Sequence, residues 1–111
     1  MLINCVAYEN GKKLADITVE AISEYLARPD CFVWVALKDP GPGELAVMQH
    51  EFGLHDLAVE DARKTNQRPK IDEYGDELFG ALKTIELEGD EFQIGEVDVF
   101  VGPNYVLSVR N

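Results

Sequence analysis

The chain has 111 residues, of which 46% are hydrophobic and 28% charged, a composition typical of one globular domain that buries a core. Its formal net charge of −11 argues against nucleic acid as the main partner, because phosphate binding needs a basic face. The longest apolar run, residues 31–37, is far shorter than the roughly 20 residues of a membrane helix, and no signal-peptide pattern opens the chain. We therefore expect one soluble domain over residues 1–111.

The first half of the chain shows alternating strand and helix patterns. Residues 2–8 and 12–17 are predicted to form a hairpin, because Asn10-Gly11 between them is a preferred two-residue turn. Thr18 is placed to cap a short helix that Pro29 ends. The apolar run CFVWVAL then predicts a buried central strand. A turn at Pro40-Gly41-Pro42-Gly43 leads into a further helix, predicted over residues 44–52.

The segment FGLHDLAVEDARKTNQRPKIDEY, residues 52–74, predicts a second helix close behind the first. Gly53 should end the earlier helix, since glycine readily adopts the left-handed conformation found there. His55 can cap the next helix, which should run to about Lys64. Pro69 then forces the chain into an extended course, so that residues 71–74 are expected to be a turn or the entrance to a strand.

Asp61 is the unusual residue of this predicted helix, because it lies within an apolar stripe on a helical wheel of about 100° per residue. The stripe comprises Leu54, Leu57, Ala58, Ala62 and Thr65. The neighbouring Glu60 is expected to pair with Lys64 one turn later. A buried carboxylate needs a partner, so two interpretations of Asp61 stay open. It is held by loop amides near Asn66 or by Arg68, or it contacts a metal ion or another subunit.

Charge is distributed unevenly around this segment. Four of the ten basic residues cluster there, at positions 63, 64, 68 and 70, and are expected to pair within the chain. The excess of 21 acidic residues suits the attraction of cations, although most of these residues are expected to be solvated surface. Asp56 and Asp72 are further candidates for subunit contacts, and are expected first to be surface charges.

The rest of the chain predicts strands. Runs over residues 78–88, 92–101 and 105–109 are separated by turn signals at Gly89-Asp90 and Gly102-Pro103-Asn104. The element order β-β-α-β-α-α-β-β-β predicts an α/β fold, in which a mixed β-sheet is flanked by helices as an α/β/α sandwich.

The sequence carries no recognisable catalytic motif. It has no HExxH, GxSxG, GxxxxGK[ST] or GxGxxG pattern and no Cys/His cluster for zinc, so we do not expect an enzyme. Cys5 and Cys31 fall in predicted strands and are expected to be reduced core residues. The binding chemistry that remains is that of carboxylates, which suit Mg²⁺ because it is a hard ion that takes oxygen ligands and keeps several waters.

The pattern FGLH-x-L-A-V-E-D followed by Gln67-Arg68-Pro69-Lys70 resembles the N-terminal cytoplasmic domain of CorA-type magnesium/cobalt transporters. One position departs: Asp56 follows His55 where the family usually has proline, and both residue types suit the first turn of a helix. The strand WVAL with its following Pro40, and the final FVGPNYVLSVR, are also similar to the family, so the resemblance spans most of the chain.

The resemblance implies an ion-sensing regulatory domain on the cytoplasmic side of the inner membrane, gated by intracellular Mg²⁺ at subunit interfaces. It makes Glu60 and Asp61 the candidate ligands of a regulatory Mg²⁺ site, which the long stalk helix of the neighbouring subunit completes in a homopentamer. Adjacent helical residues point about 100° apart, so one would bind directly and the other through water or at a second ion. An isolated domain should therefore bind Mg²⁺ weakly.

The family's stalk, its two membrane helices and its Gly-Met-Asn pore motif lie outside these residues, which predicts that the chain is a fragment of a longer transporter. A zinc transporter of the same superfamily remains an alternative, because the pore would set ion selectivity. A stand-alone soluble α/β binding module without a membrane partner is a second alternative. A small hydrolase is a third, for which the sequence offers neither a nucleophile nor a metal site.

Overall fold

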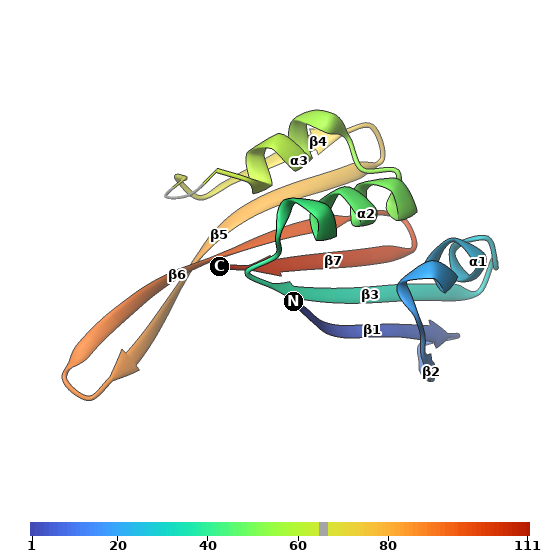
Figure 1. Ribbon diagram of the computed structural model, residues 1–111, viewed down its shortest axis with the longest axis horizontal. Helices are drawn as coiled ribbons and strands as arrows, with labels where there is room; N and C mark the ends of the chain where they lie inside the picture. Colours follow the sequence, from blue (N-terminus) through green and yellow to red (C-terminus); the bar gives the residue numbers. More distant parts are fainter. Residues whose placement is uncertain (65–66) are drawn as a thin grey trace.

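The computed structural model of the chain describes residues 1–64 and 67–111, whose strands form one seven-stranded sheet (Figure 1). The strand order is β2-β1-β3-β7-β6-β5-β4, with β3 and β7 parallel and the other neighbours antiparallel. The mixed sheet expected from the sequence is thereby confirmed. The strands are β1 Leu2–Glu9, β2 Lys12–Asp16, β3 Cys31–Lys38, β4 Lys70–Tyr74, β5 Glu77–Glu88, β6 Glu91–Val101 and β7 Tyr105–Arg110.

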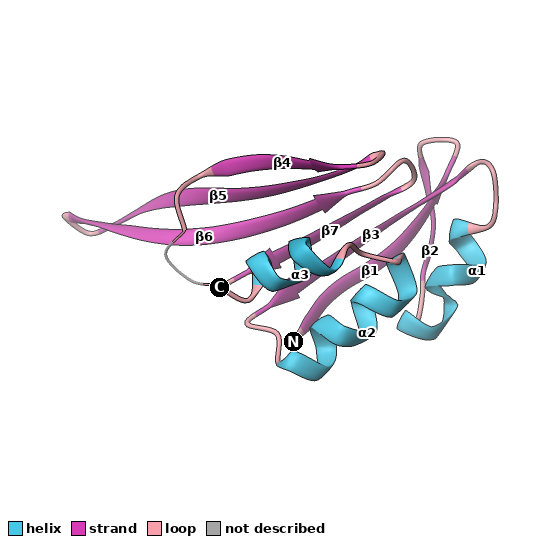
Figure 2. Ribbon diagram, turned by 90° about the horizontal axis from the view of Figure 1, so that it is seen from above, coloured by secondary structure: helices cyan, strands magenta, loops and turns pink. Residues whose placement is uncertain are grey.

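Three helices lie together on one face of this sheet (Figure 2). They are α1 Ile22–Leu26, which continues a 3₁₀ turn over Val19–Ala21, then α2 Pro42–Phe52 and α3 Asp56–Ala62. A sheet flanked by helices agrees with the predicted architecture. Within the described residues, however, the helices form a single layer, so the opposite face of the sheet is not covered by the second helical layer that a three-layer sandwich would have.

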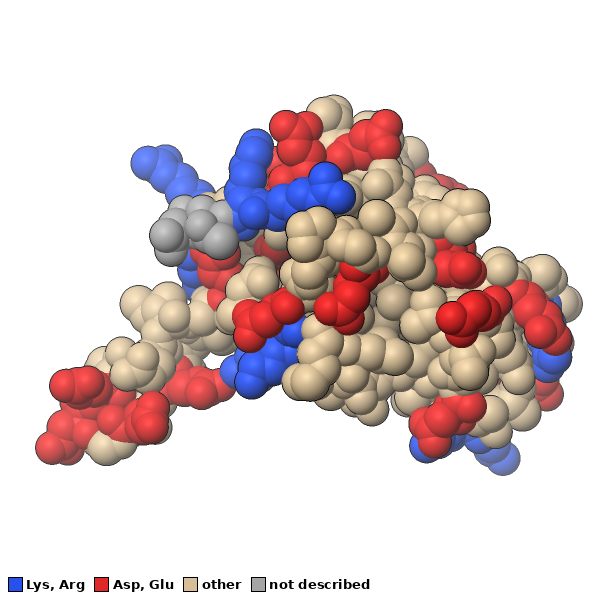
Figure 3. Space-filling view, viewed as in Figure 1, with Lys and Arg blue, Asp and Glu red and all other residues tan. Residues whose placement is uncertain are grey.

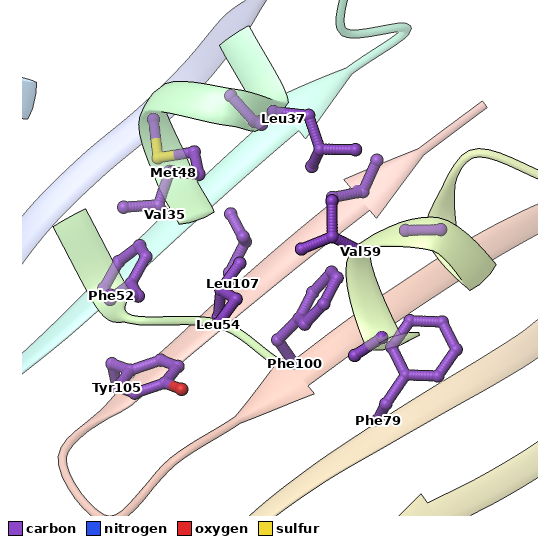
Figure 4. Close-up of a cluster of buried hydrophobic side chains, with 14 of the residues drawn as sticks. Val35, Leu37, Met48, Phe52, Leu54, Val59, Phe79, Phe100, Tyr105 and Leu107 are labelled. Carbon is purple, nitrogen blue, oxygen red and sulfur yellow. The ribbon is translucent and has the colours of Figure 1, made fainter. Parts of the chain in front are cut away.

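The core lies between the helices and the sheet (Figure 4). Strand β3 shows the arrangement: Val33, Val35 and Leu37 are buried beneath the helices, while Phe32 is 36% exposed on the other face. The apolar run CFVWVAL is therefore an interior strand, as predicted, but only one of its two faces is fully buried. Helix α2 contributes Leu45, Met48 and Phe52 to the same core.

Local turn signals are realised in the structure. Asn10 and Gly11 both have positive φ angles, 50° and 79°, as a two-residue hairpin turn requires. Gly53 ends α2 in the left-handed conformation, at φ 67°. Cys5 and Cys31 are buried free cysteines on strands, as expected, and burial raises the pKa of the Cys5 thiol.

Three predictions about the ends and number of the elements are corrected. Thr18 makes no side-chain cap; its carbonyl accepts from the Ala21 N–H at 3.1 Å instead. Helix α2 begins at Pro42, two residues earlier than predicted, because proline fits the first helical turn and Glu44 accepts from the Gly41 N–H at 3.2 Å. Residues 70–74 are a full strand, β4, which adds an element to the predicted order because it pairs along β5.

Candidate functional site

Helix α3 is positioned by the connection that precedes it. The Leu54 N–H donates back to the Gln49 carbonyl at 3.1 Å, and Leu54 itself is only 5% exposed, so the chain turns sharply into the core. His55 then caps α3, because its Nδ1 atom accepts from the Leu57 N–H at 3.1 Å. Its ring stacks on Tyr74 of β4, with 4.6 Å between centroids. The predicted cap is confirmed, and it also ties α3 to β4.

The buried face of α3 differs from the predicted apolar stripe. Ala58, Val59 and Ala62 are buried, whereas Leu57 is 55% exposed. The helix ends at Ala62, two residues before the predicted end. The sheet beneath α3 decides which side is buried, and it places the Asp61 side chain, 14% exposed, at the border between core and surface. Thr65, the last residue of the predicted stripe, lies outside the described residues.

Asp61 is held by two lysines. Its Oδ2 atom lies 2.7 Å from Lys70 Nζ, and its Oδ1 atom lies 3.3 Å from Lys64 Nζ. Because Lys70 lies on β4, its contact with Asp61 joins α3 to that strand. Lys70 Nζ also lies 3.0 Å from Asp72 Oδ2 on the same strand. The ion pair predicted with Arg68 is therefore replaced by one with Lys70, whose register on β4 brings it beneath the helix.

Two further partners were predicted near Asp61: Lys64 as the partner of Glu60, and loop amides near Asn66. Lys64 pairs with Asp61 three residues earlier, so the expected pair with Glu60 is wrong. Asn66, the other proposed neighbour of Asp61, lies outside the described residues. Gln67 donates its side-chain N–H to the Asp61 carbonyl, which ties the connection to the end of α3.

The contact between Asp61 and Lys70 shifts the pKa values of both groups. The hydrogen bond from Lys70 holds the pKa of the Asp61 carboxyl below its ordinary value, against the opposing effect of burial. Hydrogen bonds to Asp61 and then to Asp72 raise the pKa of Lys70. Both groups are therefore charged throughout the neutral range.

Glu60 and Asp61 come together at an open pocket of about 410 Å³ between α3 and β4. The pocket brings four carboxylates and two ammonium groups to one surface, so it is polar with an excess of negative charge. Its lining residues are Leu57, Glu60, Asp61, Lys64, Lys70, Asp72, Glu73 and Tyr74. The sequence identified Glu60 and Asp61 as candidate metal ligands and Asp72 as a candidate for subunit contacts, but gave no role to Glu73.

The pocket fits a magnesium ion in donor chemistry but only in part in geometry. Carboxylate oxygens are the ligands that Mg²⁺ takes. Glu60 is exposed, whereas both oxygens of Asp61 are already engaged by lysines. Among the described residues, no group of three or more His, Cys, Asp or Glu side chains is arranged to hold a metal ion. The pocket therefore offers Glu60 as an open ligand and Asp61 only in exchange with an ammonium group.

Asp98 is a buried carboxylate that the sequence analysis missed. It lies on β6 between Ala81 and Val109 of the neighbouring strands and is 1% exposed. Within the described part of the chain, neither of its oxygens has a hydrogen-bond partner. Burial, followed by the charges of Glu96 and Asp61, raises the pKa of Asp98 to about 7. Strand alternation places Asp98 on the face opposite Val97 and Val99 and on the same face as Phe100, but alternation alone does not show that this face is the buried one.

No helix within the described ranges is long and apolar enough to cross a membrane.

Comparison with known proteins identifies the sequence family. Residues 29–111 match the family described as CorA-like Mg²⁺ transporter protein. The protein YfjQ of Bacillus subtilis (strain 168), whose name describes a candidate metal ion transporter, is 32% identical over 109 residues. The match covers 96% of this chain and 32% of YfjQ, so the chain spans about a third of that relative's length.

Solved structures share the fold. Full-length CmaX superposes with a TM-score of 0.70 at 18% identity, over 98% of this chain and 34% of CmaX. The complete CorA magnesium transporter from Methanocaldococcus jannaschii gives 0.66 at 17% identity, over 98% of this chain and 32% of that one. The soluble domain of the same CorA superposes with a TM-score of 0.63 at 16% identity, over 96% of this chain and 41% of that domain. Since its family match extends over most of its length, the chain belongs to the CorA-like Mg²⁺ transporter protein family, a family of transporters rather than enzymes.

Proposed function

We propose that this chain is the ion-sensing regulatory domain of a divalent-cation transporter, with magnesium and cobalt as the transported ions. Family membership supports this assignment, as does a relative named for metal ion transport. The domain would lie on the cytoplasmic side of the membrane, and further segments of the transporter would form the stalk and the pore.

The observation that carries the proposal is the convergence of carboxylates at the pocket between α3 and β4. Glu60 and Asp61 come from the helix, and Asp72 and Glu73 come from the strand. Such a surface attracts cations and can supply part of a coordination shell. The described residues provide no complete set of ligands, so the remaining oxygens would come from outside this domain.

The two candidate ligands would act differently. Glu60 is exposed and would bind Mg²⁺ directly. Asp61 would act through a water molecule, because Lys70 and Lys64 hold its two oxygens. The stalk helix of the neighbouring subunit in a homopentamer would complete the site. When no ion is bound, facing carboxylates would repel one another by about 1 kcal/mol per pair at 4 Å in bulk water, which would loosen the interface and open the pore.

A titration of the isolated chain with Mg²⁺, followed by amide chemical shifts in NMR, tests the site. We expect weak binding, with shifts confined to residues around the pocket and reduced by Glu60→Gln. Glu88→Gln is the matched control, because Glu88 is an exposed carboxylate on β5 that does not line the pocket. A tight stoichiometric site that Asp61→Ala abolishes would contradict the proposal.

Fractionation of the source cells, with an antibody against this domain, tests the transporter assignment. We expect the native protein to be found in the membrane fraction. In a transport assay, Glu60→Ala and Asp61→Ala should alter the dependence of ion uptake on intracellular Mg²⁺. Uptake of zinc in preference to magnesium and cobalt would instead favour a zinc transporter. A native product in the soluble fraction would favour a stand-alone binding module.

A further inference from the structure

The hairpin of β5 and β6 extends beyond the rest of the sheet as an arm, residues 84–94 (Figure 1). Strand β4 pairs with β5 only as far as Ala81, and β7 pairs with β6 only as far as Val97. The two strands of the arm therefore pair with each other, and their outer edges carry no further strand among the described residues.

One face of the arm is apolar and exposed. Ile85 is paired across the strands with Ile94, and Leu87 with Phe92. These four side chains are between 67% and 72% exposed. They alternate with Glu86 and Glu88 on the other face of β5, so the arm is an amphipathic ribbon. A contiguous group of large exposed apolar side chains marks a contact surface more often than isolated ones do.

The arm is also the most acidic projection of the molecule (Figure 3). Its residues are TIELEGDEFQI, with four acidic residues and neither lysine nor arginine. Glu86 is paired with Arg110 at the base, which leaves Glu88, Asp90 and Glu91 exposed around the tip. A surface that fits the arm must therefore be apolar with a positive rim.

The C-terminal end of α3 provides such a surface. A pocket of about 270 Å³ has mainly apolar walls with one arginine, and we name it the acceptor pocket. Its lining residues are Pro40, Gly41, Pro42, Leu45, Ala62, Arg63 and Asn111. Lys64 and Lys70 of the basic cluster are engaged by Asp61, whereas Arg63 and Arg68 are exposed. Figure 3 shows lysine and arginine side chains gathered over this end of the helix.

We propose that the arm of one copy docks at the acceptor pocket of a second copy of this chain, with Phe92 as the apolar anchor and Arg63 facing the acidic tip. An arm-to-arm contact would instead bring two acidic tips together without compensation. A contact between two different surfaces leaves each copy with one free arm or one free pocket, so that repetition can close a ring. The contact goes beyond the proposed ion-sensing role, because its residues are not those of the carboxylate pocket.

Sedimentation of the chain at increasing concentration, in chelator and at low salt, tests the contact. We expect reversible association that weakens with salt, because opposite charges face each other. Phe92→Ser and Arg63→Glu should each raise the dissociation constant at least roughly tenfold. Leu14→Ser and Lys12→Glu are matched controls at the opposite end of the sheet, since both residues are exposed on β2, and they should leave association unchanged.

A mixing experiment separates this contact from a symmetric one. The Phe92→Ser copy keeps its acceptor pocket, and the Arg63→Glu copy keeps its arm. An equimolar mixture should therefore form a one-to-one dimer, although each variant alone stays monomeric. Failure of the mixture to associate would overturn the proposal. So would an Arg63→Glu variant that associates like the wild type while Phe92→Ser does not, or a wild-type chain that is monomeric at about 1 mM. Because chelator is present throughout, these outcomes are independent of the magnesium titration.

Discussion

The ammonium group of Lys70 lies 2.7 Å from the carboxylate of Asp61, and this contact joins strand β4 to helix α3. Asp72 lies 3.0 Å from the same ammonium group, so one cation sits between carboxylates of two elements. A metal ion that reached Asp61 directly would have to displace this lysine. The pocket therefore contains its own positive charge, and this favours Glu60 as the ligand that first meets an incoming ion.

Replacing Lys70 with methionine tests this relationship. We expect Lys70→Met to lower the free energy of unfolding by about 1 kcal/mol, because the lysine side chain is 36% exposed and water screens the ion pair. The same change should strengthen Mg²⁺ binding, since Asp61 loses its closer cation. Chemical denaturation and an NMR titration measure the two effects. Lys12→Met, at an exposed position on β2, should change neither.

Asp98 should make stability depend on pH. Its raised pKa means that the folded state holds a proton which the unfolded chain has already released, so the contribution of Asp98 to the free energy of unfolding falls as pH rises from about 4 to about 7. The Asp98→Asn variant has no carboxyl at this position, so it should not lose this part of its stability as pH rises. We expect the variant to be more stable than the parent by about 1–3 kcal/mol above neutral pH, and the difference to vanish near pH 4.

Denaturation curves across this pH range, compared as variant minus parent, give the measurement. Asp90→Asn at the exposed tip of the arm is the matched control and should show no such trend. An Asp98→Asn variant with the same pH dependence as the parent would mean that this carboxyl is ionised in the fold at neutral pH.

Gly102 should not tolerate a side chain. A Cβ atom there would clash with Cε1 of Tyr105, a residue that is 3% exposed and whose ring stacks on Phe52. Since this ring cannot move away freely, Gly102→Ala should lower stability by about 1–3 kcal/mol. Gly43 lies in helix α2, where an added Cβ atom would meet no other atom within 4 Å, so Gly43→Ala should be neutral or stabilising by up to about 1 kcal/mol. Equal effects at the two glycines, compared by chemical denaturation, would contradict this explanation.

The His55 cap should contribute measurably to stability. His55→Ala removes both the acceptor for the Leu57 N–H and the stacking contact with Tyr74, and we expect a loss of about 1 kcal/mol. His50→Ala is the comparison, because His50 is exposed in the last turn of α2. Thermal unfolding of the two variants distinguishes a capping role from a general effect of losing a histidine.

Much of the fold could be predicted because its signals are local. The turn at Asn10-Gly11, the helix end at Gly53 and the cap at His55 depend on the conformations that these residues and their immediate neighbours favour. Strand β3 follows from its apolar run for the same reason. The resemblance of residues 52–74 to a transporter family likewise rests on residue types in a fixed order, which the family match confirms.

Other features depend on residues that meet only after folding. The pairing of β4 along β5 decides that Lys70, rather than Arg68, reaches Asp61. The packing of α3 on the sheet buries Ala58, Val59 and Ala62 and leaves Leu57, a predicted core residue, at the surface. Burial of Asp98 likewise depends on the strands on either side of it. A sequence shows which residues carry charge and how they alternate, but the partner of each charge is set by strand register and helix placement. These are fixed by packing across the whole sheet.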